Sequence, residues 1–430
     1  MSKLQELINK LCPNGVEFKP LGEVFEMRNG YTPSKNNPDF WEGGTIPWFR
    51  MDDIRENGRI LSDSIQHITP SAIKGKGLFE ANSFILATTA TIGEHALIIA
   101  DSQANQQFTN LKVRKSLSNL LVTKFIYYYM FIVDDFCKRN TNVSGFASVD
   151  MGKLKKMPFP VPPIEVQEEI VRILDSFSDY AAELQAELQA RKQQYEYYRN
   201  LLLTFNPSAY GCGTDDEQKD GVTTWEGRNY KIEWKKMGEI GTFIRGNGLQ
   251  KKDFTESGVG CIHYGQIYTH YGTFATKTKS FVSESFAQKL RKAKTGDIVI
   301  ATTSENVEDV GKAVAWLGNE DIAISGDAYI YTHEQNPKFI AYLFQTERFL
   351  AFKKMNVSGT KVTRISGDSL AKYPIPIPPL ELQEKIVAIL DRFETLVNDL
   401  TNGLPAEIAA VKDQYEYYRN KLLTFKKLSA

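Results

Sequence analysis

The amino-acid sequence predicts an α+β protein in which two pseudo-symmetric α/β domains are joined by two long antiparallel coiled-coil helices. The chain repeats itself once over its length, and each copy ends in a long run of helical heptads. Strand-like apolar runs precede these heptads. The predicted segments are two α/β domains at 1–157 and 230–373, proline-led helical segments at 158–206 (a central spacer) and 374–430 (a distal spacer), and a linker at 207–229.

The repeat is clearest in two segments of each copy. "PFPVPPIEVQEEIVRILD" begins at Pro158 and aligns with "PIPIPPLELQEKIVAILD" from Pro374, and the heptapeptide "QYEYYRN" occurs at 194–200 and 414–420. Between these anchors the similarity falls to short islands. A duplication that merely enlarged the protein is the alternative explanation, but the two kinds of segment have diverged to very different degrees. The sequence therefore indicates that the variable and constant parts serve different functions.

The constant segments have the pattern of long helices. Alternating prolines favour an extended lead-in to a helix, with a groove-binding PxxP ligand as the alternative. From Ile170 to Phe205 the apolar positions alternate steps of four and three, which is a heptad seam of about five repeats and a helix of about 54 Å. In the second copy, Asn402-Gly403 and Pro405 coincide with two successive steps of four and predict a kink or interruption.

Composition and charge restrict the function. Lys+Arg and Asp+Glu both number 52, so the formal net charge is zero, whereas a protein that binds nucleic acid alone is usually basic. Contact with DNA would therefore need local patches, such as the lysines and arginines between Lys277 and Lys294, or a partner that supplies positive charge; solvated surface charge is the alternative. The separated cysteines and the polar start of the chain predict a cytoplasmic protein.

The motifs of familiar enzymes are absent. There is no phosphate-binding Gly-x-x-x-x-Gly-Lys-Ser/Thr loop, no Asn/Asp-Pro-Pro-Tyr/Phe tetrapeptide of amino-methyltransferases, and no histidine spacing suited to a metal. We accordingly assign no catalytic residue and no metal ligand, and we expect no cofactor in this chain.

The variable domains instead contain loops rich in side chains that bind base edges and phosphates. Asn and Gln can pair with adenine, Arg and Lys with guanine, and hydroxyl groups with phosphates. Each loop alone is more simply a surface loop, but such loops recur at aligned positions of both domains. The predicted DNA-binding residues are Arg28, Asn29, Tyr31, Thr32, Ser34, Trp48, Arg50, Asp52, Gln106, Gln107, Arg245, Asn247, His263, Tyr264, Gln266, Lys361, Thr363 and Arg364.

The heptapeptide repeat predicts a second kind of surface. The first and third of its three tyrosines, Tyr195 and Tyr198, lie on the heptad seam, as Tyr415 and Tyr418 do in the second copy, so helix packing explains them. Packing does not require the positions beside the seam to match. We therefore predict one docking surface presented twice, for two identical partner subunits. Its residues are Glu196, Tyr197, Arg199, Asn200, Glu416, Tyr417, Arg419 and Asn420.

The proline-led segments and the closing "QYEYYRNLLLTF" and "QYEYYRNKLLTF" resemble the specificity subunit of type I restriction-modification systems over essentially the whole chain. The resemblance implies two target-recognition domains that bind a bipartite DNA site, conserved helices between them, and no catalysis by this chain. It also implies two adenine-methyltransferase subunits that use S-adenosylmethionine. Two nuclease–translocase subunits that use ATP and Mg²⁺ can join such a complex.

Two readings from other classes remain open. A pseudo-symmetric scaffold would bind only proteins through its helices, so an exchange of its variable domains would leave DNA methylation unchanged. An enzyme with an unfamiliar site would act on DNA or S-adenosylmethionine as a purified single chain.

Overall fold

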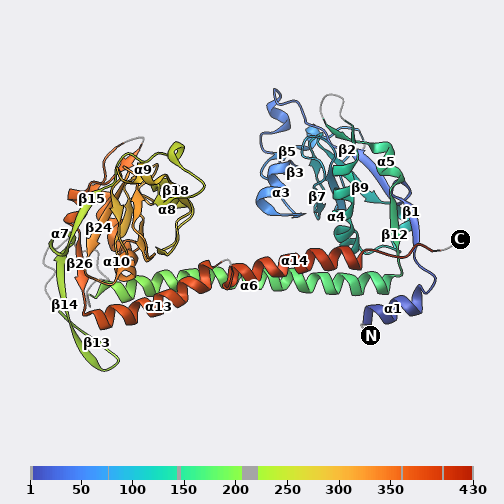
Figure 1. Cartoon of the computed structure of the whole chain (residues 1–430). Helices are drawn as coiled ribbons and strands as arrows, with labels where there is room; N and C mark the ends of the chain where they lie inside the picture. Colours follow the sequence, from blue (N-terminus) through green and yellow to red (C-terminus); the bar gives the residue numbers. More distant parts are fainter. Residues whose placement is uncertain are drawn as a thin grey trace. The chain divides into compact units, whose positions relative to one another are not determined.

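The computed structural model describes residues 3–75, 77–142, 147–205, 221–359, 362–399 and 401–428. The chain forms two compact units, which we call unit 1 (residues 1–184 and 408–430) and unit 2 (residues 185–407). Each unit contains a repeated α/β domain and parts of the long helices (Figure 1), as the predicted fold class requires. The unit boundaries cut across the helical segments, because each unit includes helix from both copies of the repeat.

Unit 1 is built on a five-stranded sheet of order β2-β9-β6-β7-β4, beside a three-stranded sheet of order β5-β3-β8. Strand β6 is buried on both faces: Phe84 and Leu86 join one apolar cluster with helix α4, and Ile85 and Ala87 join another. Burial of both faces explains why this strand reads as a continuous apolar run. The elements are β2 (Phe25–Asn29), β3 (Ile46–Phe49), β4 (Ile60–Leu61), β5 (His67–Ile68), β6 (Ser83–Ala87), β7 (His95–Ile98), β8 (Gln103–Ala104), β9 (Phe108–Val113) and α4 (Thr123–Arg139).

Unit 2 repeats this topology. Its five-stranded sheet has the order β15-β24-β20-β22-β17, and each strand takes the place of the corresponding strand in unit 1. The second sheet, β18-β16-β23-β19, adds one strand at its edge. The elements are β15 (Gly241–Arg245), β16 (Val259–Ile262), β17 (Phe274–Ala275), β18 (Ser280–Val282), β19 (Lys292–Ala293), β20 (Ile298–Ala301), β22 (Ala313–Trp316), β23 (Ile322–Ile324), β24 (Ala328–His333), α10 (Pro337–Leu343) and α11 (Glu347–Asn356).

In each unit, the strand at the start of the α/β domain pairs antiparallel with the strand at its end. In unit 1, β1 (Glu17–Pro20) pairs with β12 (Pro158–Val161), which confirms the extended path of the proline-rich run. In unit 2, β14 (Arg228–Lys236) pairs with β26 (Pro374–Ile377) in the same register. The backbone N–H that follows each first strand then donates to the last residue of the domain, from Leu21 to Met157 at 2.8 Å and from Met237 to Tyr373 at 3.0 Å.

Part of the predicted linker is a β-hairpin, which corrects that prediction. Strand β13 (Gly221–Trp225) pairs with β14, and Glu226 and Gly227 form the turn with φ angles of 49° and 75°. Two consecutive positive φ angles are characteristic of the tight turns that match the twist of antiparallel strands. The β-branched and aromatic residues before this turn favour a strand. Residues 207–220 of the predicted linker lie outside the described part of the chain.

The proline-led segments continue as helices. Helix α6 (Ile164–Thr204) is 41 residues long. The second copy is interrupted, as predicted from Asn402, Gly403 and Pro405, and forms α13 (Leu380–Asn398) and α14 (Leu404–Leu422). The first residue of this break, Asp399, accepts a hydrogen bond from the backbone N–H of Thr401 at 2.7 Å, so the interruption has its own local hydrogen bonding.

The heptad seam packs within each unit. In unit 1, the ring of Phe177 near the start of α6 stacks on that of Tyr418 near the end of α14, with 5.4 Å between centroids. In unit 2, the ring of Phe393 on α13 stacks on Tyr195 and Tyr198 near the end of α6, at 6.4 Å and 5.7 Å. The start of one segment thus packs on the end of the other in both units, which is the predicted antiparallel pairing. Among the described helices, none is long and apolar enough to cross a membrane.

Candidate nucleic-acid interface

The two units share one feature at which polar loops converge, and we call it the corner. In each unit a glycine follows the first strand of the five-stranded sheet: Gly30 follows β2, and Gly246 follows β15. Each glycine lies beside the turn that precedes the neighbouring strand, which is β9 in unit 1 and β24 in unit 2. Both glycine N–H groups donate 2.9 Å bonds across the corner, to Phe108 and Ala328. A Cβ atom at Gly30 or Gly246 would lie 2.3 Å or 2.2 Å from a backbone oxygen, so only glycine fits this close approach.

The corner of unit 1 carries three of the predicted residues with side-chain amides, Asn29, Gln106 and Gln107. The carbonyl oxygen of each one accepts a hydrogen bond from a neighbour: that of Asn29 from Thr109 at 2.9 Å, that of Gln106 from Thr32 at 2.5 Å, and that of Gln107 from Asn105 at 3.2 Å. Asn29 and Gln106 are exposed, and Gln107 is half-buried. The structure therefore brings together four of the predicted residues, counting Thr32, at one edge of the sheet.

The corner of unit 2 carries an arginine and a carboxylate instead. The Nε of Arg245 donates to the carbonyl oxygen of Gly326 at 2.7 Å, and a terminal nitrogen lies 3.7 Å from the Asp327 carboxylate. The Arg245 side chain is 59% exposed. Together with Gln250 and the neighbouring glycines these two side chains line an open concavity of about 450 Å³. Arg245 takes the place of Asn29, and Asp327 that of Gln107.

Several predicted residues hold the loops next to the corners in place. Arg28 is half-buried, lies over the ring of Phe79 at 4.6 Å and donates to a backbone carbonyl; burial lowers its pKa. The Tyr31 hydroxyl group donates to the carbonyl of Ala72 at 2.9 Å and accepts from the backbone N–H of Lys74. Asn247 bonds the backbone on both sides of Leu290, at 2.9 Å and 2.7 Å. These three residues fix loops, which the sequence alone did not reveal.

Three of the predicted DNA-binding residues are buried and make structural hydrogen bonds inside unit 1 or unit 2. Trp48 is 2% exposed and donates its indole N–H to the carbonyl of Tyr31. Gln266 is 9% exposed and accepts from the backbone N–H of His263 at the start of α8 (Tyr264–Thr269). His263 is itself buried and accepts from Gly265, and burial lowers its pKa. A short polar motif can serve helix capping as readily as base contact, so the motif did not distinguish the two roles.

The remaining predicted residues lie on separate loops. Arg50 immediately precedes α3 (Met51–Asn57) and lies 3.8 Å from the exposed Asp52. The exposed Ser34 lies in the loop after the corner. Tyr264 is half-buried beside His263, with 4.6 Å between the ring centroids. The last three predicted residues lie close together in the sequence. Thr363 is buried and Arg364 is exposed, both in β25 (Thr363–Arg364), and Lys361 lies outside the described residues.

The repeated heptapeptide splits into two groups. Tyr197 and Tyr417 are 53% and 59% exposed, and Glu196 and Glu416 beside them are exposed as well. Arg199 and its counterpart Arg419 pack inside their own units instead. The two tyrosines, the two glutamates and Asn420 are the exposed members of the predicted docking surface.

Intramolecular contacts account for Arg199, Arg419 and Asn200. Arg199 lies over the Tyr195 ring at 5.1 Å and donates to Gln345 at 3.4 Å, and Arg419 lies over the Phe131 ring at 4.4 Å. Asn200 accepts from the backbone N–H of Glu347 at 2.9 Å. Its counterpart in the second copy, Asn420, is exposed.

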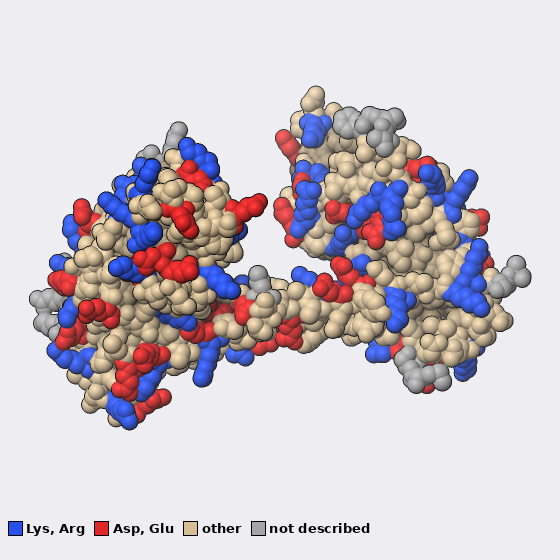
Figure 2. All heavy atoms as spheres, viewed as in Figure 1, with Lys and Arg blue, Asp and Glu red and all other residues tan. Residues whose placement is uncertain are grey.

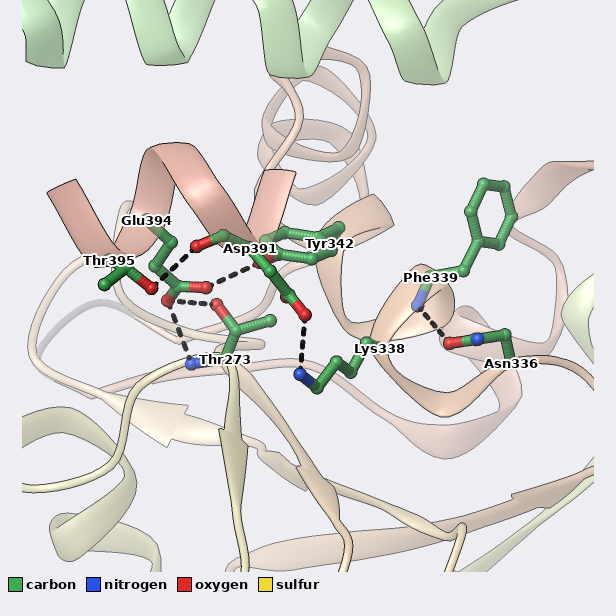
Figure 3. A network of polar contacts seen from close by, with 8 residues as sticks. All are labelled: Thr273, Asn336, Lys338, Phe339, Tyr342, Asp391, Glu394 and Thr395. Atoms are coloured by element: carbon green, nitrogen blue, oxygen red, sulfur yellow. Dashed lines mark hydrogen bonds and ion pairs between the residues drawn. The ribbon is translucent and has the colours of Figure 1, made fainter. Parts of the chain in front are cut away.

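Each α/β domain is fixed to its helix by a polar network that the two units share. In unit 2 (Figure 3), Asp391 on α13 accepts from Lys338 at 2.7 Å and from the Tyr342 hydroxyl group at 2.8 Å. Tyr342 also lies 2.7 Å from Glu394, whose other oxygen accepts from Thr273. Burial and the nearby carboxylates raise the pKa of Tyr342, so its hydroxyl group stays protonated and donates.

Unit 1 contains the same joint. Asp175 on α6 accepts from Lys124 at 2.7 Å and from Tyr128 at 2.6 Å. A buried glutamine completes the joint in both units. The amide oxygen of Gln167 accepts from the backbone N–H of Val122 at 2.8 Å, and its NH₂ group donates to two backbone carbonyls, both at 2.7 Å.

The corresponding glutamine in unit 2 is Gln383, whose oxygen accepts from the backbone N–H of Asn336 at 3.0 Å. Its NH₂ group donates to Pro378 and to the Gln335 side chain, both at 2.8 Å. The identity of these glutamines in both repeats was the signal that sequence reasoning missed. The joint orients each α/β domain on a rigid helix.

Figure 2 shows basic and acidic side chains interspersed on the face in view. A local excess of positive charge lies in the segment 289–294 of unit 2, where Lys289, Arg291, Lys292 and Lys294 are all exposed. In the described part of the chain, no group of three or more His, Cys, Asp or Glu residues is arranged to hold a metal ion.

A duplicated α/β domain with divergent polar corners, each fixed by the same joint to a paired helix, defines a recognition subunit with two related binding domains. The chain matches the family described as the type I restriction modification DNA specificity domain twice, at residues 13–191 and 230–410. It belongs to this family, whose members are the specificity subunits of type I restriction-modification systems and give them their DNA-sequence specificity.

Individual relatives agree with this assignment. The chain is 36% identical to the EcoprrI specificity subunit of Escherichia coli, over 96% of this chain and 94% of the relative. It is 28% identical to the EcoR124I/EcoR124II specificity subunit of the same species, over 99% and 98%.

Solved structures share the fold. A chain from a type I restriction-modification complex, solved in work on complex assembly and conformational transition, aligns with a TM-score of 0.61 at 17% identity, over 96% of this chain and 98% of that one. The HsdS subunit from Thermoanaerobacter tengcongensis aligns with a TM-score of 0.53 at 18% identity, over 96% and 97%.

Proposed function

We propose that each unit binds one half of a bipartite DNA site, that the helices set the length of the spacer between the halves, and that the chain itself catalyses no step. The observation that carries this proposal is the pair of corners. Their backbone hydrogen bonds are the same, but their exposed side chains differ. Two corners with the same backbone hydrogen bonds but different polar side chains suit two domains that recognise different base sequences.

The proposal includes partners that supply the chemistry. Two adenine-methyltransferase subunits would bind S-adenosylmethionine and dock on this chain, and two nuclease–translocase subunits using ATP and Mg²⁺ could join them. Zero net charge fits this arrangement if the methyltransferases contact much of the DNA backbone, because phosphate contacts otherwise require a basic protein.

A domain exchange tests DNA recognition. The exchange replaces residues 237–373 with a second copy of residues 21–157, and both junctions keep the backbone hydrogen bond and strand pairing that close each domain. We expect the complex to methylate a site in which the half bound by unit 1 occurs twice. Sequencing of methylated adenines in cells with this chain and the methyltransferase measures the result. An unchanged methylated site would favour the scaffold without DNA recognition.

The exposed tyrosines of the repeat provide a test of docking. We expect the double variant Tyr197→Ala and Tyr417→Ala to weaken assembly with the methyltransferase at least tenfold, because aromatic side chains often contribute more than 1.4 kcal/mol to an interface. Binding of the purified subunits is measured by calorimetry. Tyr180→Ala, at an exposed tyrosine on α6 outside the repeat, is the matched control. Wild-type affinity in the double variant would locate the docking surface elsewhere.

A further inference from the structure

The corner of unit 2 holds its arginine in a defined orientation. The Nε–H of Arg245 is engaged by Gly326, and the Asp327 carboxylate lies beside one terminal nitrogen. The carboxylate is in turn within 3.4 Å of the Thr303 hydroxyl group. These contacts occupy the inner side of the guanidinium group and leave its outer edge, with N–H groups from both terminal nitrogens, on an exposed surface. Two parallel N–H groups match the O6 and N7 acceptors of guanine.

The corner of unit 1 offers a different set of groups. The amide oxygens of Asn29, Gln106 and Gln107 are engaged by neighbouring donors. Among the described residues, none accepts a hydrogen bond from the NH₂ groups of these three amides. The corner therefore presents an array of donors without a positive charge, which suits acceptor atoms such as the N7 and O6 or O4 atoms of the major groove.

The surroundings of the unit 2 corner suit DNA. The two hydrogen bonds between Asn247 and the backbone join the corner to the basic segment 289–294, so the position that would contact a base is adjacent to three lysines and Arg291, which would contact phosphates. Phosphate contacts supply affinity, and contacts to base edges supply discrimination. One surface thus provides both kinds of group.

We propose that the two corners are the specificity-determining positions of the chain, an inference that rests on the proposed function. In unit 2, Arg245 recognises a guanine, with Asp327 as the residue that positions it. In unit 1, the NH₂ groups of Asn29, Gln106 and Gln107 recognise acceptor atoms on the bases of the other half-site. A change at one corner therefore alters one half-site and leaves the other intact.

The test uses the assembled methyltransferase complex and plasmid libraries in which each half-site position is randomised in turn. We expect Arg245→Ala to reduce the preference for guanine at one position of one half-site by about 10- to 100-fold, with the other half-site unchanged. Arg245→Lys should give a similar loss, because lysine keeps the charge but lacks the planar pair of donors. The double variant Gln106→Ala and Gln107→Ala should relax the other half-site alone.

Matched controls separate base recognition from other effects. Arg392→Ala removes an exposed arginine on α13, far along the chain from the corner, and should leave both half-sites unchanged. Thermal unfolding of each variant should match that of the wild type. Wild-type preferences in the Arg245 variants, or equal loss at both half-sites, would overturn the proposal. If the wild-type chain directs no bipartite methylation at all, the proposed function fails instead.

Discussion

A chain with one additional Ala-Glu-Leu-Gln unit inserted after Gln189 is expected to direct methylation to a site whose spacer is longer by one or two base pairs. The insertion repeats the sequence pattern of residues 182–189, so the helix continues through it. Four more residues lengthen a helix by about 6 Å, and B-DNA rises about 3.4 Å per base pair. Both half-sites should stay the same, because the insertion changes no residue of either α/β domain.

Sequencing of methylated adenines in cells that express the variant with the methyltransferase gives the spacer directly. A variant of unchanged length, Gln185→Lys with Gln189→Lys, is the control, since both side chains are exposed on α6. An unchanged spacer in the insertion variant would mean that helix length does not set the separation of the half-sites.

The second large effect is expected at the joint between each α/β domain and its helix. We expect Gln383→Leu to lower the free energy of unfolding by about 3 kcal/mol, because a leucine leaves the backbone N–H of Asn336 and the carbonyl oxygen of Pro378 without partners in a buried site. Gln167→Leu should have a similar effect in unit 1, where the side chain makes three hydrogen bonds to the backbone.

Chemical unfolding of the full-length chain measures the loss, and amide hydrogen exchange at the start of α10 or α4 locates it. Gln189→Leu, at an exposed position on α6, is the control and should change the stability by less than about 0.5 kcal/mol. Equal stabilities of Gln383→Leu and the control would show that the joint is not a source of stability.

The helices were predictable because their signals are local. Proline fixes the extended lead-in, the heptad spacing predicts the seam, and Asn402, Gly403 and Pro405 predict the break between α13 and α14. All of these depend on residues close together in the sequence. The hairpin of β13 and β14 also has local signals, but the surrounding Gly, Asp, Ser and Thr residues favoured a linker.

The candidate interface was predictable only in part. Asn29 and Gln106 were both expected to face DNA, but their meeting at one corner depends on strand pairing between distant segments. Asp327 went unrecognised because nothing nearby in the sequence marks it as a neighbour of Arg245. Conversely, Trp48 and Gln266 have the chemistry of base contacts, and their burial becomes visible only in the folded chain.

We propose that this chain directs adenine methylation to a bipartite DNA site, and a comparison of methylated adenines across the genome in cells with and without its gene tests this most directly. We expect a motif of two short, different half-sites separated by a spacer of fixed length, which disappears when the gene is deleted and returns when it is restored. Persistence of every methylated motif after deletion would contradict the claim.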